Sequence, residues 1–310
     1  MTTDTIVITE ARIHPDAVAL LADYKLVYTG ARFTEDELVA LCRTEQPVAI
    51  LARYGLFNER VLAASQKLKV ISRHGVGMDA IDQPAARRLG IEALAAVGSN
   101  SQAVAEHALG LMLACARRIS WLDQRMHGGH WDKPGYLGLE LHGATLGIVG
   151  CGAIGGRVLR FAQAIGMRVV VCDPYLDASA LPADVELLPL EPLLERCDIV
   201  SLHCPLDDST RGLLTADRLA LLRRGAIVIN TARAGLFDEA AMQARLGTGE
   251  LQLGLDCFVT EPLPENSPWL QLDNAVLTPH IGGTTDGGLR GMAVGAARNI
   301  LKVLQRVQAG

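Results

Sequence analysis

Short apolar runs alternate with amphipathic stretches along the first third of the chain. Ile6–Ile8, Val48–Ala52 and Val70–Ser72 are largely apolar, which is typical of strands buried on both faces of a sheet. Between these runs apolar residues recur at helical spacing, and Thr34 with Glu37 has the spacing of a helix-capping box. This alternation predicts a smaller α/β domain at the start of the chain.

The alternation continues after a long helix predicted over Asn100–Arg118 and a loop predicted over Met126–Gly138. The strands predicted beyond the loop are Thr145–Val149, Arg168–Cys172, Ile199–His203, Ala226–Asn230, Leu253–Asp256 and Ala275–Leu277. Helices are expected between these strands, and the last helix begins at Thr284. We therefore predict an α/β fold whose main part is a doubly wound parallel sheet, a Rossmann fold, with helices on both faces.

Composition narrows the range of functions. The chain has 310 residues, which fits two domains of ordinary size. Its net charge is −5 and it lacks a block of Lys and Arg, so a nucleic-acid partner is not expected. We see neither a secretory signal nor an apolar stretch long enough to span a membrane. The seven cysteines include no C-x-x-C pair and suit a reduced, cytoplasmic protein without a disulfide framework or a metal site.

A glycine turn after the first strand of the main domain indicates a dinucleotide site. Gly150, Gly152 and Gly155 form a G-x-G-x-x-G motif, with Ala153 and Ile154 inside it. The first glycine allows the tight turn, the second lets the backbone approach a pyrophosphate, and the third lets helix and strand pack closely. Asp173, at the end of the next strand, lies where a ribose diol would be held. No Arg follows it to neutralise a 2′-phosphate, so we predict NAD rather than NADP.

Three polar residues follow other strands at the carboxyl edge of the same sheet, where ligands bind in such folds. They are Arg233, Glu261 and His280. A guanidinium can bind a carboxylate through two hydrogen bonds, and an imidazole can exchange a proton with an alkoxide. A neighbouring carboxylate would fix the tautomer of that imidazole. The alternatives are a surface salt bridge for Arg233 and a simple turn for Glu261.

Four motifs occur together, in the order expected of one family. They are the glycine turn with Asp173, then Asn230-Thr231-Ala232-Arg233, then Leu255-Asp256-Cys257-Phe258-Val259-Thr260-Glu261-Pro262, and finally Thr278-Pro279-His280-Ile281-Gly282-Gly283. With them the chain resembles the D-isomer-specific 2-hydroxyacid dehydrogenases, most closely the 3-phosphoglycerate and hydroxypyruvate dehydrogenases. The resemblance implies Arg233 as substrate anchor, His280 as the acid/base and Glu261 as its partner. It implies that the cofactor site further includes Asp256, His203, Cys204, Pro205, Thr231, Ala232, Gly282 and Gly283, with Asp256 contacting the nicotinamide amide.

The resemblance also implies a domain plan. The substrate domain is discontinuous, residues 1–99 and 285–310, and the NAD-binding Rossmann domain covers residues 100–284. The long helix after Asn100 resembles a dimerisation element, so a homodimer is expected. The chain departs from the family pattern at Ala153, Ala234 and Cys257, and none of these changes removes a catalytic group.

The substrate prediction depends on a second set of residues in the first domain. Arg53 and Arg73 each follow a strand, next to a loop formed by His74, Gly75, Val76 and Gly77. We expect this loop to bind the substrate carboxylate and the arginines to meet a second polar or anionic group on carbon 3, as in 3-phosphoglycerate. The alternative is that both arginines form ion pairs with acids such as Glu59 or Asp79.

Other functions stay open at this point. Glyoxylate or hydroxypyruvate reduction uses the same residues. A non-catalytic NAD sensor of the corepressor type would not need the Arg, Glu and His. His203 is the alternative acid/base, and His107 is expected to be a structural residue on a helix.

Overall fold

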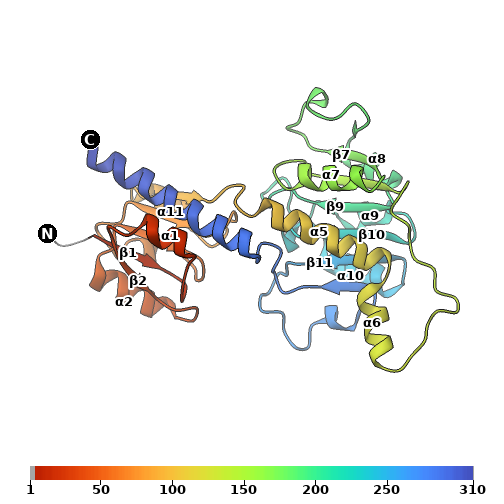
Figure 1. Cartoon of the computed structure of the whole chain (residues 1–310), viewed down its shortest axis with the longest axis horizontal. Helices are drawn as coiled ribbons and strands as arrows, with labels where there is room; N and C mark the ends of the chain where they lie inside the picture. The colour runs from red at the N-terminus through yellow and green to blue at the C-terminus, as the bar shows by residue number, and fades with distance from the viewer. Residues whose placement is uncertain (1–3, 310) are drawn as a thin grey trace. The chain divides into compact units, whose positions relative to one another are not determined.

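The computed structural model describes residues 4–309 and divides the chain into two compact units. The N-terminal unit comprises Met1–Asn100 and Thr284–Gly310, and the C-terminal unit comprises Ser101–Gly283. The sequence places the same boundaries one residue away, at 99/100 and 284/285. Figure 1 shows a separate sheet with its own helices in each unit.

The N-terminal unit is built on a five-stranded parallel sheet in the order β2-β1-β3-β4-β5. Its strands are β1 (Thr5–Ile8), β2 (Lys25–Tyr28), β3 (Ala49–Ala52), β4 (Val70–Arg73) and β5 (Glu92–Ala95). Helices α1 (Pro15–Leu20) and α11 (Asp286–Ala309) bury their apolar sides against one set of inward-facing strand residues. Helices α2 (Glu35–Glu45), α3 (Glu59–Leu62) and α4 (Gln83–Arg88) pack against the other. Residues from both ends of the chain therefore complete this unit.

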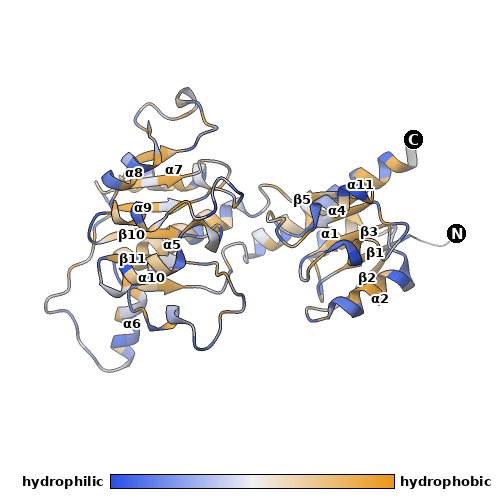
Figure 2. Ribbon diagram, turned by 180° about the vertical axis from the view of Figure 1, so that it is seen from behind, coloured by the Kyte–Doolittle hydropathy of each residue, from blue (hydrophilic) through white to orange (hydrophobic). Residues whose placement is uncertain are grey.

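The C-terminal unit is built on a seven-stranded parallel sheet in the order β12-β11-β10-β9-β6-β7-β8. Its strands are β6 (Thr145–Val149), β7 (Arg168–Cys172), β8 (Glu186–Leu187), β9 (Ile199–Leu202), β10 (Ala226–Asn230), β11 (Leu251–Leu255) and β12 (Ala275–Leu277). Helices α5 (Ser101–Ala116) and α7 (Gly155–Ala164) cover one face, and α8 (Leu190–Arg196), α9 (Ala216–Ala220) and α10 (Glu239–Gly247) cover the other. Helices on both faces explain why the central strands are almost entirely apolar, as the colouring of Figure 2 shows.

The predicted α/β fold with a doubly wound parallel sheet is confirmed, and some details of the prediction were wrong. The long helix ends at Ala116, and Arg118, with a left-handed φ of 49°, begins a separate helix α6 (Ile119–His127). The loop predicted from Met126 therefore begins two residues later, after His127. The elements β5, β8, α4, α6 and α8 were not predicted, because each is short or largely polar on its exposed side.

All seven cysteines are free thiols, and burial raises the pKa of Cys204 to about 11 and that of Cys257 to about 12. Among residues 4–309, no helix combines the length and the apolar character that a membrane crossing requires.

Candidate active site

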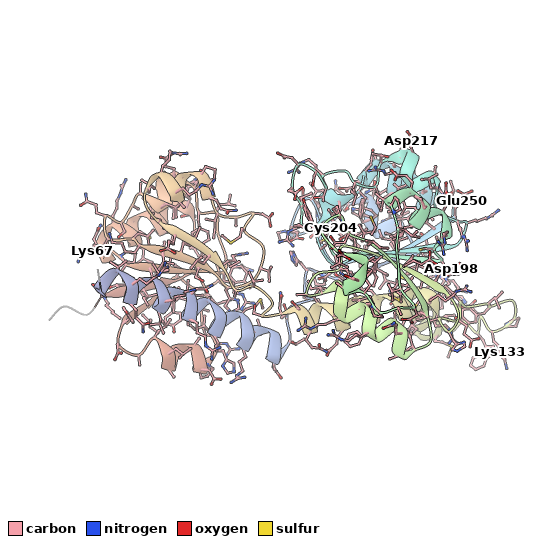
Figure 3. All side chains as sticks on the ribbon, turned by 90° about the horizontal axis from the view of Figure 1, so that it is seen from above. Lys67, Lys133, Asp198, Cys204, Asp217 and Glu250 are labelled. Carbon is pink, nitrogen blue, oxygen red and sulfur yellow. The ribbon has the colours of Figure 1, made fainter. Side chains whose placement is uncertain are left out.

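The carboxyl edge of the seven-stranded sheet contains a topological switch point. From β6 the chain moves outward to β7 and β8, then returns to β9 on the other side of β6. In open α/β sheets ligands bind in the crevice outside the strand ends at such a point. Figure 3 labels both ends of β9, where Asp198 precedes the strand and Cys204 follows it. The glycine turn follows β6, so it lies beside the turn that carries Cys204.

The three glycines of the turn have different environments, and those of Gly150 and Gly155 agree with the tight turn and the close packing predicted for them. Gly150 has φ 86°, and a Cβ there would lie 2.7 Å from the backbone nitrogen of Cys204. A Cβ on Gly155 would overlap the carbonyl oxygen of Gly150. A Cβ on Gly152 would meet no atom within 4 Å. The backbone at Gly152 therefore faces open space at the start of α7, where a pyrophosphate could approach the helix N-terminus.

Asp173 links the glycine turn to the end of β7. Its Oδ2 accepts a hydrogen bond from the backbone nitrogen of Cys151 at 2.9 Å, and its Oδ1 accepts one from that of Tyr175 at 3.0 Å. An ionised carboxylate has about four acceptor sites, so both oxygens can still accept hydrogen bonds from a ribose diol. The residues of this site fit an NAD molecule.

Two unpaired polar atoms lie at the ends of neighbouring strands in the same crevice. Leu202 pairs with Asn230 between β9 and β10, so the next residues, His203 and Thr231, leave the sheet side by side. His203 Nδ1 and Thr231 Oγ1 are buried without a hydrogen-bond partner in the described part of the chain. A buried polar atom left unpaired costs about 1–3 kcal/mol, so both atoms indicate a missing ligand or water.

The environment of His203 argues against the alternative that it is the acid/base. Its Nε2 lies 2.8 Å from Ser201 Oγ, and burial lowers the pKa of His203 to about 4. A neutral imidazole that is hydrogen-bonded to a serine is a poor general acid near neutral pH, because the acidic imidazolium form is scarce.

His280 and Glu261 form the expected pair. His280 Nδ1 lies 2.8 Å from Glu261 Oε2 and 3.0 Å from Oε1. The backbone nitrogen of Phe258 donates to Glu261 Oε1 at 2.9 Å, which holds the carboxylate in place. The His280 side chain is 51% exposed, so its ring is accessible. Because the carboxylate binds Nδ1, the other ring nitrogen is left for a substrate.

A buried carboxylate holds the loop that carries His280, and sequence reasoning missed this role. Asp256 is 2% exposed, and its Oδ1 accepts hydrogen bonds from Thr278 Oγ1 at 2.6 Å and from the backbone nitrogen of Ile281 at 2.9 Å. Its Oδ2 accepts one from the backbone nitrogen of Gly282 at 2.8 Å. His107 Nε2 lies 2.9 Å from Thr278 Oγ1 and 3.3 Å from Asp256 Oδ1.

These contacts also set the charge of Asp256. Burial by itself would raise the pKa of Asp256, but the hydrogen bonds from His107, Thr278 and the two backbone amides together hold it below the usual value. His107 is thus a hydrogen-bonded helix residue, as expected. A contact between Asp256 and the nicotinamide amide stays a prediction and would have to use a remaining lone pair.

The turn that presents Arg233 is shaped by the buried side chain of Asn230. Asn230 Nδ2 donates to the carbonyl oxygen of Arg233 at 2.8 Å, and its Oδ1 accepts from the backbone nitrogen of Ala232 at 3.0 Å. Arg233 Nη1 donates to the carbonyl oxygen of Ala232 at 2.6 Å. Ala234 occupies a short 3-10 helix (Ala234–Leu236), so this departure from the family pattern does not disturb the turn.

The substrate residues predicted in the N-terminal unit lie at the carboxyl edge of its own sheet. Arg53 Nε lies 2.9 Å from Glu10 Oε2, and Arg73 donates to the carbonyl oxygens of Ala52, Arg53 and Gly77. Glu59, one of the two acids named above as alternative partners, binds Arg88, at 2.8 Å. Arg53 does form an ion pair, as that alternative supposed, but its partner is Glu10. In the adjoining loop Gly75 has φ 141° and Val76 is 39% exposed, whereas His74 is 5% exposed.

Comparison with known proteins identifies the family. Residues 109–282 match the model of the NAD-binding domain of the D-isomer specific 2-hydroxyacid dehydrogenases, and this segment is more than half of the chain. The chain belongs to this family. The predicted family and the predicted NAD cofactor are both confirmed by this match.

The chain is similar to two enzymes of the family over most of its length. It is 37% identical to D-3-phosphoglycerate dehydrogenase of Methanocaldococcus jannaschii over 297 residues, 94% of this chain and 56% of that protein. It is 36% identical to hydroxypyruvate reductase of Thermotoga maritima over 288 residues, 92% of this chain and 93% of that protein. The chain thus spans about half the length of the phosphoglycerate dehydrogenase and most of the reductase. The crystal structure of the TT0316 protein from Thermus thermophilus matches with a TM-score of 0.89 and 36% identity, covering 97% of both chains.

Proposed function

We propose that the protein is an NAD-dependent dehydrogenase that interconverts D-2-hydroxy acids and 2-keto acids. The observation that carries the proposal is the His280–Glu261 pair, which follows β11 and β12 at the same sheet edge as the glycine turn and Asp173. A protein that only sensed NAD would not need this pair. When bound, NADH supplies the hydride that reduces carbon 2 of the keto acid.

The side chains of this sheet edge account for the rest of the reaction. Arg233 binds the carboxylate and polarises the neighbouring carbonyl group. His280 donates the proton that converts the carbonyl oxygen into the hydroxyl, and takes it back in the oxidation. Glu261 stabilises the imidazolium and keeps Nδ1 protonated, so that the ring faces the substrate with one fixed nitrogen.

For the substrate, we propose an acid with a polar group on carbon 3, contacted by Arg53, Arg73 and the loop from His74 to Gly77. The arginines favour 3-phosphoglycerate or a similar anionic acid, as predicted from the sequence. One specific observation favours the second candidate, hydroxypyruvate: Arg53 is paired with a carboxylate, Glu10, and Arg73 donates to three carbonyl oxygens.

Steady-state absorbance kinetics test the proposal. The purified protein should oxidise NADH in the presence of glyoxylate, hydroxypyruvate or 3-phosphohydroxypyruvate, with a higher kcat/KM for NADH than for NADPH because Asp173 would repel a 2′-phosphate. NADH binding without turnover of any of these acids would instead favour the sensor function.

We further propose a homodimer formed through α5 and the segment after it. None of the residues of α6 is buried, and the large apolar side chains of Ile119, Trp131 and Leu137, in α6 and the segment after it, are 53%, 71% and 92% exposed. Light scattering at micromolar concentration should give twice the chain mass, and a monomer mass would refute the proposal. The seven free thiols favour a cytoplasmic location.

A further inference from the structure

His107 connects helix α5 to the loop that contains His280. Helix α5 packs on β10 and β11 of the C-terminal unit (Figure 1). The His107 side chain extends from this helix toward residues 278–283, which we call the His280 loop. Its Nε2 lies 2.9 Å from Thr278 Oγ1, and a Cβ added to Gly282 would lie 3.5 Å from its Cδ2. His107 therefore contacts the loop on both sides of His280.

The hydrogen bonds around Thr278 show that His107 is a donor. Despite its burial, the hydrogen bonds that Asp256 accepts hold the pKa of its carboxyl below the usual value, so the carboxylate is ionised near neutral pH and can only accept. Thr278 Oγ1 lies 2.6 Å from Asp256 Oδ1 and 3.5 Å from the carbonyl oxygen of Leu255, which also only accepts. The single hydroxyl hydrogen of Thr278 is therefore directed to Asp256. His107 Nε2 must then carry a hydrogen and donate it to Thr278.

The same hydrogen lies close to the Asp256 carboxylate. His107 Nε2 is 3.3 Å from Asp256 Oδ1, and Asp256 is 2% exposed. Hydrogen bonds to a charged group are stronger than those between neutral groups, and the low dielectric constant of a buried site strengthens them further. His107 thus connects this carboxylate to α5, and the carboxylate in turn accepts from the backbone nitrogens of Ile281 and Gly282.

The packing of α5 on the sheet depends on other residues. Four side chains of the helix are no more than 3% exposed and belong to the apolar cluster between α5 and the sheet: Ala105, Ala108, Leu111 and Met112. The side chain of His107 is 22% exposed and is not part of this cluster. Loss of the imidazole should therefore alter the His280 loop more than it alters folding.

We propose that His107 is a positioning residue, whose Nε2 donor holds the His280 loop in the conformation that catalysis requires. It acts through Thr278 and Asp256 on the backbone that follows His280, rather than on a reacting atom. The inference rests on the proposed function, because it concerns the residue that serves there as the acid/base. Every residue involved belongs to the C-terminal unit.

Three substitutions of His107 test the proposal. His107→Leu removes the donor at similar size, His107→Asn places an amide nitrogen near the position of Nδ1, and His107→Gln places one near that of Nε2. We expect kcat for glyoxylate or hydroxypyruvate to fall by about 10- to 100-fold in His107→Leu and His107→Asn, because a small displacement of a catalytic group has an effect of this order. His107→Gln should keep kcat within about threefold of the unmodified value, because the donor is retained.

The separate effects on kcat and KM distinguish positioning from general damage. The proposed carboxylate anchor, Arg233, lies on a different turn, which Asn230 shapes, so the KM for the keto acid should change by less than about threefold. Gln102→Leu is the matched control, since it places leucine at an exposed position of the same helix, where Gln102 donates to Glu106. It should leave kcat and KM unchanged.

Hydrogen exchange provides a readout that does not depend on turnover. The amides of Ile281 and Gly282 donate to Asp256, so they should exchange faster in His107→Leu than in the unmodified protein or in His107→Gln. If the unmodified protein reduced no keto acid, the proposed function would fail, and this comparison would still test whether His107 holds the loop.

Several results would overturn the role of His107. They are equal kcat in His107→Asn and His107→Gln, unmodified kcat in His107→Leu, the same fall in Gln102→Leu, and unchanged exchange of both amides. If His107→Leu does not fold, as judged by its thermal unfolding, the comparison of His107→Asn with His107→Gln decides. A loss of kcat in His107→Asn that is absent in His107→Gln supports the proposal.

Discussion

His280 has an unusual backbone conformation for a residue with a large side chain. Its φ is 54°, in the left-handed region, which costs a non-glycine residue roughly 1–2 kcal/mol. The hydrogen bonds that Asp256 accepts from Ile281 and Gly282, directly after His280, offset this cost. The conformation places the ring beside Glu261, so the His280–Glu261 pair depends on a buried carboxylate that hydrogen-bonds the two residues after His280.

The role of His280 gives the first prediction. His280→Ala removes the proposed general acid and should lower kcat by about 10²–10⁴-fold, with the dissociation constant for NADH nearly unchanged. Glu261→Gln should alter mainly the pH dependence of kcat/KM, because its carboxylate stabilises the imidazolium. Turnover near the unmodified level in His280→Ala would remove the residue from the mechanism, and an unaltered pH profile in Glu261→Gln would count against the pairing.

The sequence could indicate Arg233, Glu261 and His280 because each follows a short apolar strand, and the carboxyl ends of parallel strands share one edge of the sheet. It could not indicate which residues from distant parts of the chain contact one another around the strand ends. His107 reaches Thr278 across 171 positions, and Glu10 reaches Arg53 from another strand end. Such contacts depend on how helix and loop side chains meet in three dimensions, and local patterns of apolar and polar residues do not contain that information.

At the scale of elements, the glycines of the turn between β6 and α7 have different roles. Two of them are required for folding, and one is expected to be required for cofactor binding. Gly150 and Gly155 lie where a side chain would collide with backbone, whereas Gly152 faces open space. We predict that Gly152→Ala folds with an unchanged thermal midpoint but binds NAD at least about tenfold more weakly, since its methyl group occupies the path of the pyrophosphate. Gly155→Ala should instead lower the thermal midpoint by several degrees.

Gly156→Ala provides the control for this pair. Gly156 follows Gly155 in α7, and a Cβ added there would lie 3.9 Å from the nearest atom, which is an ordinary van der Waals contact. This variant should retain NAD binding and gain about 0.4–1 kcal/mol in the free energy of unfolding. Equal loss of NAD binding in Gly152→Ala and Gly156→Ala would show that the turn is sensitive to any added side chain, contrary to the assignment of Gly152 to the pyrophosphate.

Element prediction succeeded where burial on both faces produced a continuous apolar run, as in β6, β7 and β10. It failed for β5, whose pattern is exposed and partly buried rather than buried throughout, and for β8, which has two residues. It also assigned the last two residues of α6, Met126 and His127, to the loop predicted over Met126–Gly138. Edge strands and exposed helices lack the neighbours that impose a hydrophobic pattern, so their sequences carry a weaker signal.

At the scale of the whole molecule, buried neutral histidines make the stability sensitive to acid. His74 belongs to the N-terminal unit and His203 to the C-terminal unit, and burial lowers the pKa of each to about 4, compared with about 6.5 in an unfolded chain. Between these values the unfolded chain binds more protons than the folded one. The stability is therefore full above pH 6.5 and falls as the pH drops toward 4.

This linkage predicts a measurable loss in mild acid. Between pH 7.5 and pH 5 the free energy of unfolding should fall by roughly 2 kcal/mol for His74. The fall should be smaller for His203, because its ring nitrogen Nδ1 is buried but the residue as a whole is only partly buried. Urea unfolding at the two pH values measures the loss, and His74→Asn should reduce it. A stability that is constant over this range, or that rises in acid, would contradict the neutral state of both histidines.

The central claim is that NADH and His280 together convert a 2-keto acid into a D-2-hydroxy acid. The most direct measurement incubates the protein with hydroxypyruvate and NADH that carries deuterium at nicotinamide carbon 4, using each of the two deuterated forms in turn. Mass spectrometry and chiral chromatography then examine the product. The account predicts D-glycerate with one deuterium at carbon 2 from one of the two forms. An L product, or no transfer of deuterium from either form while product accumulates, would contradict it.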